Sequence, residues 1–77
     1  MKNPIRFSNK NKQKLFIYHY YDNSMFQLCE LSQNETTILN IPFYSHIAIK
    51  TGYDNGNYII PAETIMETYI DKNYFIF

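Results

Sequence analysis

The side chains best suited to covalent chemistry are one thiol and two imidazoles. Cys29 could pair with His19 or His46, because an imidazole beside a thiol can activate it as a nucleophile. The spacing of these residues matches no nucleophile elbow or protease signature. A lone cysteine in an apolar segment is usually a buried thiol. We therefore expect no catalytic residue, and the chain is predicted not to be an enzyme.

Metal and cofactor sites need ligand patterns that the sequence lacks. A zinc site uses four Cys, His or acidic ligands with close pairs, and no such set occurs. The segment Asp54–Asn57 resembles the start of a calcium loop, but the later acidic ligand is missing. The two glycines of the chain are too few for a phosphate-binding loop. We expect no metal and no cofactor.

Aromatic side chains are the most abundant candidates for binding. The chain has eight tyrosines and six phenylalanines among 77 residues. An enclosed ring buries about 150–250 Å², and a chain this short hides only about 60% of its unfolded surface. Some rings should therefore reach the surface, where tyrosine is a favoured contact residue. Part of the excess reflects codon usage, since abundant Phe, Tyr, Ile, Asn and Lys indicate an AT-rich genome.

Charges are separated along the chain, although the net charge is zero. All basic residues except Lys50 and Lys72 lie within residues 1–14, ahead of the first acid. This polar segment is predicted to be a flexible basic leader, with residues 15–77 forming one β-rich domain. Its lysines are either solvated side chains attracted to the acidic body, which we favour, or phosphate contacts. The candidates for phosphate contacts are Lys10, Lys12 and Lys14.

Three strands are expected in the first half of the body. Leu15–Tyr21 is a dense run of aromatic and β-branched residues, which favours a strand covered on both faces. Asp22–Ser24 has the composition of a turn, and Met25–Leu31 is predicted to return as the second strand. Thr36–Ile41 is predicted as the third strand, which Pro42 ends.

A hairpin is expected over residues 47–60. Asn55-Gly56 is the preferred pair for a two-residue type I′ turn. That turn would place Tyr53 opposite Tyr58, on one apolar face, so both tyrosines are predicted to pack rather than to be exposed.

Residues 61–71 are predicted to form one short helix, with a strand as the alternative. Pro61 and Glu63 suit a helix start, and the later apolar residues fall on one helical stripe. The apolar end Tyr74–Phe77 should pair at a sheet edge or dock on a partner. The predicted fold is therefore α+β and β-rich: an antiparallel meander of about five strands with a C-terminal helix. A small SH3- or OB-like β-barrel is the alternative.

Binding is the class of function that these observations favour. We expect a small non-enzymatic module that docks on a larger protein or protein–nucleic acid complex. The AT-rich composition suggests a phage or mobile-element accessory protein that inhibits a host defence complex, such as a CRISPR nuclease. No apolar run reaches the ~20 residues of a membrane helix, so a cytoplasmic protein without a membrane partner is expected. The predicted contact residues are Tyr20, Tyr21, Phe43, Tyr44 and Tyr74.

Two other binding functions remain open. A small barrel could bind single-stranded nucleic acid by stacking bases on Phe16, Tyr18 and Tyr20. The near absence of arginine, and of lysine within the aromatic strands, makes this less favoured. Alternatively, the protein could be a self-associating structural subunit, in which Tyr74–Phe77 completes the sheet of another copy.

Overall fold

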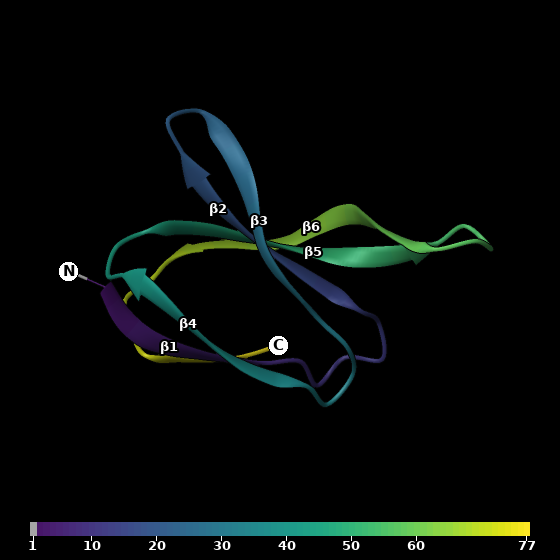
Figure 1. Ribbon diagram of the computed structural model, residues 1–77, viewed down its shortest axis with the longest axis horizontal. Coiled ribbons are helices and arrows are strands. Elements are labelled where there is room, and N and C mark those ends of the chain that lie inside the picture. The colour runs from purple at the N-terminus through teal and green to yellow at the C-terminus, as the bar shows by residue number, and fades with distance from the viewer. Residues whose placement is uncertain (1) are drawn as a thin grey trace.

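Two β-sheets make up the protein (Figure 1). The computed structural model describes residues 2–77, so residue 1 of the expected leader lies outside the described residues. One sheet has three strands in the order β4 (Thr36–Pro42), β1 (Lys2–Ser8), β7 (Tyr74–Ile76). The other has four strands in the order β3 (Ser24–Leu31), β2 (Leu15–Tyr21), β5 (His46–Asp54), β6 (Ile59–Tyr69).

The fold is all-β, so the prediction of a small β-rich domain is confirmed and the predicted C-terminal helix is wrong. Residues 2–77 contain no helix, and hence none that could cross a bilayer. The three strands predicted in the first half of the body are confirmed as β2, β3 and β4. Tyr74–Phe77, expected at a sheet edge, contributes β7, which pairs in parallel with β1.

The core lies between the two sheets and is built by alternation along the strands. Successive side chains of a strand point to opposite faces, so each of β1, β2 and β5 sends two alternate apolar residues into the core. Phe7 stacks on Phe75 with ring centroids 5.5 Å apart, and on Phe77 at 6.3 Å. The enclosed apolar side chains are Ile5, Phe7, Leu15, Ile17, Leu31, Ile41, Ile47, Ile49, Ile70 and Phe75.

The segment expected to be a flexible leader contains the central strand of the three-stranded sheet. β1 pairs antiparallel with β4 and parallel with β7, and both Ile5 and Phe7 have 0% exposure. Polar residues alternate with these two apolar ones. The segment therefore looks hydrophilic on average, although two side chains on one of its faces are fully buried in the core.

Asn9 holds the connection between β1 and β2 against the rest of the domain. Its buried amide nitrogen donates to the carbonyl oxygens of Gln13 and Leu31, at 2.8 and 2.9 Å. Its amide oxygen accepts from the backbone N–H of Asn11 at 2.8 Å. Its backbone groups bond to the turn between β3 and β4, through Asn34 and Glu35. A fully buried polar side chain thereby satisfies its own hydrogen-bonding groups and ties together the segments on both sides of it.

Residues 61–71, predicted as a helix, lie mostly in β6, an eleven-residue edge strand. The alternative prediction for this segment, a strand, is therefore confirmed. β6 pairs antiparallel with β5 over nearly its whole length, with irregularities near Lys50. Thr64, Ile65 and Thr68 are β-branched and favour this conformation. Pairing with β5 outweighs the preference of Pro61 for the first turn of a helix.

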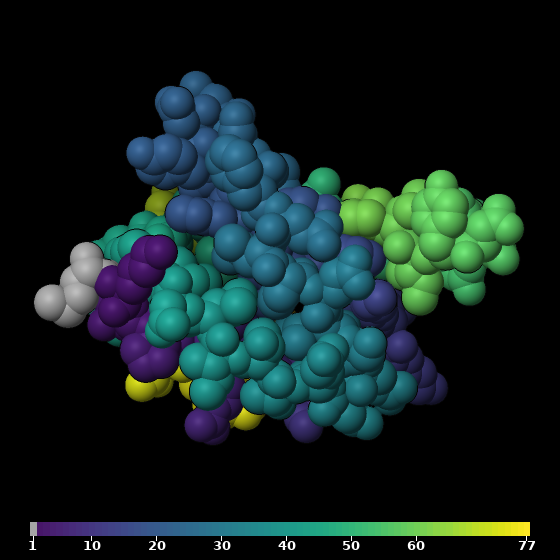
Figure 2. All heavy atoms as spheres, in the orientation of Figure 1, coloured from purple at the N-terminus to yellow at the C-terminus, as the bar shows by residue number. Residues whose placement is uncertain are grey.

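The β5–β6 hairpin exists as predicted, but in a different register. Tyr53 lies opposite Ile60 rather than Tyr58. Of the loop residues, Gly56 has a positive φ of 95° and Asn55 does not, whereas a type I′ turn needs positive φ at both central residues. Tyr53 and Tyr58 are 58% and 62% exposed, so the prediction that they pack is wrong. Figure 2 shows why: the tip of this hairpin projects from the body.

The type I′ signature occurs instead between β2 and β3. Asp22 and Asn23 have φ of 52° and 61°, and they connect the paired residues Tyr21 and Ser24. Asp and Asn tolerate this left-handed backbone because their short side chains bond locally. The hairpin with two positive φ values is thus the one without a glycine.

Gly52 allows a close approach where β5 begins to leave the body. A Cβ atom at this position would lie 2.5 Å from a methyl group of Ile59 and 3.1 Å from the ring of Phe16. The Gly52 backbone N–H also donates to the carbonyl oxygen of Lys14 at 2.7 Å. The missing side chain lets the hairpin fold over Phe16, which is 1% exposed.

Candidate functional site

Three rings form a stacked row across the outer face of the four-stranded sheet. Tyr20 of β2 is paired with His46 of β5, which is paired with Tyr69 of β6. The rings of Tyr20 and His46 have centroids 4.7 Å apart and planes inclined by 25°. Those of His46 and Tyr69 are 5.0 Å apart and inclined by 29°. We call these three residues the aromatic row.

The aromatic row is held by its neighbours, and its exposure increases toward Tyr69 at the sheet edge. His46 is held between two rings, and its Nε2 lies 3.7 Å from Oε1 of Glu67 on the same face. Tyr69 is 59% exposed although its ring is stacked. Side chains that are immobilised before binding lose less entropy when a partner arrives. The row therefore offers a contact surface that is already ordered.

The turn between β4 and β5 extends this surface at the end of the sheet. The Tyr44 N–H donates to the carbonyl oxygen of Ile70 at 2.7 Å, and the Ile70 N–H donates to that of Ser45 at 2.9 Å. These bonds tie the turn to the residue that follows Tyr69. Phe43 and Tyr44 are 43% and 78% exposed. We call the aromatic row together with Phe43 and Tyr44 the docking face.

The structure brings some of the predicted contact residues together and separates others. Tyr20, Phe43 and Tyr44 lie at one end of the four-stranded sheet. Tyr21 follows Tyr20 on the opposite face of β2, where its ring lies 6.2 Å from that of His19. Tyr74 belongs to the other sheet, on β7.

The sequence prediction did not include His46 and Tyr69 in the contact set. Tyr69 was assigned to a helical stripe, which hid its place on a strand. The alternative assignment of residues 61–71 as a strand would have placed Tyr69 near the base of the β5–β6 hairpin, close to His46.

The expected stacking platform for nucleic acid offers few free ring faces. Phe16 is 1% exposed. The ammonium of Lys50 lies 5.3 Å from the centroid of the Tyr18 ring, and Tyr20 stacks on His46. A base needs an open ring face on which to stack. The geometry of these aromatics therefore favours edge contacts over base stacking.

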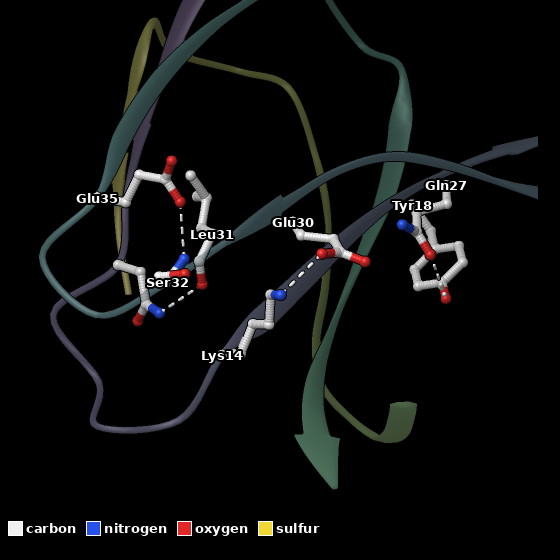
Figure 3. A network of polar contacts seen from close by, with 8 residues as sticks. Lys14, Tyr18, Gln27, Glu30, Leu31, Ser32 and Glu35 are labelled. Carbon is white, nitrogen blue, oxygen red and sulfur yellow. Dashed lines mark hydrogen bonds and ion pairs between the residues drawn. The ribbon is translucent and has the colours of Figure 1, made fainter. Parts of the chain in front are cut away.

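The three lysines considered for phosphate contacts have different environments. Lys14 pairs with Glu30, with Nζ 2.8 Å from Oε2 (Figure 3). The hydrogen bond from Lys14 holds the pKa of Glu30 below its ordinary value. Lys10 and Lys12 are exposed in the connection that Asn9 organises. Lys14 is thus already neutralised by an acid of the adjacent strand.

Cys29 does not have the environment of a nucleophile. It faces the core beside Ile17 of β2. Burial, together with the charges of Glu35 and Glu30, raises the pKa of its thiol to about 11. Reactive cysteines have lowered pKa values, because the thiolate is the attacking species.

Alkylation of Cys29 should consequently be slow in the folded protein. Relative to the ordinary value of 9.0, a pKa of about 11 lowers the thiolate fraction roughly 100-fold near pH 8. A more basic thiolate is also a stronger nucleophile, and this raises the alkylation rate by about tenfold, which offsets part of the lower thiolate fraction. Iodoacetamide labelling followed by mass spectrometry should be at least about tenfold slower in buffer than in urea. Equal rates would contradict the burial of this thiol.

The same pKa shift has a consequence for stability. The raised pKa means that the folded state favours the neutral thiol, so Cys29 contributes no pH dependence below about pH 8. Above the ordinary value of 9.0 the unfolded chain ionises first, and stability should fall as the pH rises toward 11.

Metal ligands are not clustered in the described part of the chain. Among residues 2–77, no group of three or more His, Cys, Asp or Glu side chains could hold an ion. The side chains gathered on the docking face are aromatic, with one imidazole and one nearby carboxylate. Comparisons with protein-family models, with curated proteins and with solved structures found no match to this chain.

Proposed function

We propose that this protein is a non-enzymatic binding module that docks on a larger protein through the docking face. The observation that carries the proposal is the aromatic row, in which three rings stack on one another, two of them half-buried and the third, that of Tyr69, 59% exposed. Tyrosine dominates protein interfaces because it offers a large contact area with few rotatable bonds. Stacking within the row restricts the rotation of these side chains further, before a partner binds.

A protein partner fits this surface better than single-stranded nucleic acid does. His46 is stacked on both sides, and Tyr20 and Tyr69 each have one ring face covered by it, so part of the ring area is already used within the row. Edge-on aromatic contacts and hydroxyl hydrogen bonds suit a protein surface. The carboxylate of Glu67 lies beside the row, with its Oε1 3.7 Å from Nε2 of His46, and a negative charge at this place disfavours a phosphate backbone.

The narrower part of the proposal concerns the kind of partner. The AT-rich coding composition and the small size support an accessory protein of a phage or mobile element. Such a protein would act in the cytoplasm of its host, by docking on a defence complex such as a CRISPR nuclease and inhibiting it.

Substitution of Tyr69 tests the docking face directly. The tagged protein should retain one large host complex, and the Y69A variant should bind that complex at least about tenfold more weakly, as truncated hot-spot tyrosines do. Tyr53 supplies a matched control, because it is 58% exposed against 59% for Tyr69 and lies at the hairpin tip. Affinity capture followed by a binding titration of the purified complex measures both variants.

Three results would contradict the proposal. The Y53A variant could lose binding as strongly as Y69A, which would place the contact elsewhere. No complex could be retained from any plausible host. Alternatively, Y69A could bind as well as the unsubstituted protein while its thermal unfolding stays unchanged.

A further inference from the structure

The outer face of the three-stranded sheet has a pocket, which lies on a different sheet from the docking face. A shallow pocket of about 390 Å³ lies there, lined by Pro4, Arg6, Ile38, Asn73 and Tyr74. Arg6 of β1 is paired with Ile38 of β4 on one side and with Tyr74 of β7 on the other. Since Ile5 and Phe7 enter the core, the side chain of Arg6 points outward among these partners.

Arg6 is held ready to bind an anion. It is the only arginine of the chain, and its guanidinium carbon lies 5.5 Å from the centroid of the Tyr74 ring. Stacking of this kind orients the planar group and leaves its N–H edge free for a bidentate contact with a carboxylate. The ion pairs found within residues 2–77 join Lys14 to Glu30 and His46 to Glu67, and neither involves Arg6.

Charge is divided between the two sheets. β1, β4 and β7 carry Lys2 and Arg6 and contain no Asp or Glu, so the three-stranded sheet is basic. Asp71 and Lys72, in the connection before β7, oppose each other in charge. The four-stranded sheet is acidic, with Glu30, Asp54, Glu63 and Glu67 against Lys50.

The surroundings of Arg6 are apolar as well as basic. Ile38 and Ile76 are 57% and 59% exposed on this face, and Tyr74 is 41% exposed. A free phosphate or a nucleic-acid backbone would gain nothing from such walls, and it would meet only two cations on these strands. A peptide that carries both carboxylates and apolar side chains matches both properties.

We propose that this pocket binds an acidic, partly apolar peptide segment of a partner protein, with a carboxylate of that segment held by Arg6. The carboxylate accepts from the guanidinium edge, and the neighbouring apolar side chains of the peptide pack on Pro4, Ile38 and Tyr74. This site is on a different sheet from the docking face, so it does not depend on the function proposed for that face.

The test uses NMR with a defined peptide. A five-residue peptide alternating glutamate with phenylalanine and leucine, acetylated and amidated at its ends, is titrated into the ¹⁵N-labelled protein. Amide shifts should move in β1 and β7, around Arg6 and Tyr74. The R6Q variant should bind the peptide at least about tenfold more weakly. A peptide with glutamine in place of glutamate should bind the unsubstituted protein more weakly by a similar factor, because each change removes one partner of a charge-assisted bidentate contact. The K50Q variant is the matched control, since Lys50 also lies over a tyrosine ring but on the other sheet.

Several outcomes would overturn the proposal. Shifts confined to the four-stranded sheet would do so, as would equal affinity for R6Q and K50Q. If sodium phosphate alone moved the same amides at the same concentration, the site would be one for a free anion. If the shifts around Arg6 moved with protein concentration and without peptide, a second copy of the chain would be the occupant. R6K, which keeps the charge but not the planar fork, should fall between R6Q and the unsubstituted protein.

Discussion

Replacing Phe7 with alanine should lower the free energy of unfolding by about 3–5 kcal/mol, the usual cost of deleting a buried aromatic ring. Phe7 has 0% exposure and stacks on both Phe75 and Phe77. The substitution removes the aromatic contact between β1 and the C-terminal segment, while the backbone pairing of β1 with β7 remains. A domain of this size has a total stability of only about 4–12 kcal/mol. The variant should therefore lose a large fraction of the total stability of the domain.

Urea unfolding followed by circular dichroism measures this effect. The matched control is F26A, because Phe26 is also a strand phenylalanine but is 52% exposed. That substitution should cost less than about 1 kcal/mol, as is usual away from the core. If F7A cost no more than F26A, residues 2–8 would be a detachable leader and the three-stranded sheet would not form as described.

Replacing Asn9 with alanine should cost about 2–4 kcal/mol. The buried amide of Asn9 makes three hydrogen bonds, to the backbone of Gln13, Leu31 and Asn11. The contact with Leu31 is buried, and the variant would leave that carbonyl oxygen without its partner. A buried polar group that loses its partner costs about 1–3 kcal/mol, and the two part-buried bonds add to this.

The control for Asn9 lies two residues away. Asn11 is exposed, and its bond to Asn9 uses its backbone N–H, which remains after substitution. N11A should therefore change the unfolding midpoint little, whereas N9A should lower it clearly in the same urea titration. Similar midpoints for N9A and N11A would show that the Asn9 amide does not hold this connection.

The parts of the fold that could be predicted are those with dense local signals. The run Leu15–Tyr21 predicts a strand whatever its neighbours are, and β2 has these same bounds. β1 gives a weak signal because only Ile5 and Phe7 are apolar, and their burial depends on pairing with β4 and β7, far away in the sequence. Residues 61–71 were predicted as a helix, with a strand only as the alternative, for a related reason. The helix-like start at Pro61 is local, whereas the pairing of this segment with β5 is not.

The candidate site, too, could be predicted only where local sequence signals were sufficient. Tyr20, Phe43 and Tyr44 could be selected by type, because each is aromatic and lies at or near the end of a predicted strand. The aromatic row could not be predicted as a unit, since it depends on the register of three strands. That register includes the irregular pairing near Lys50, which shifts the partners between the hairpin tip and Tyr69. Residue types indicated a contact surface, but the register determines which rings meet.

Site-specific photo-crosslinking tests the docking face most directly. A photoreactive benzoylphenylalanine is introduced in place of Tyr69, and separately in place of Tyr53, and each protein is irradiated in a host cell. The docking face predicts a covalent adduct with one large protein from position 69 and none from position 53. An adduct from position 53 alone, or none from position 69, would contradict the claim that the aromatic row forms the interface.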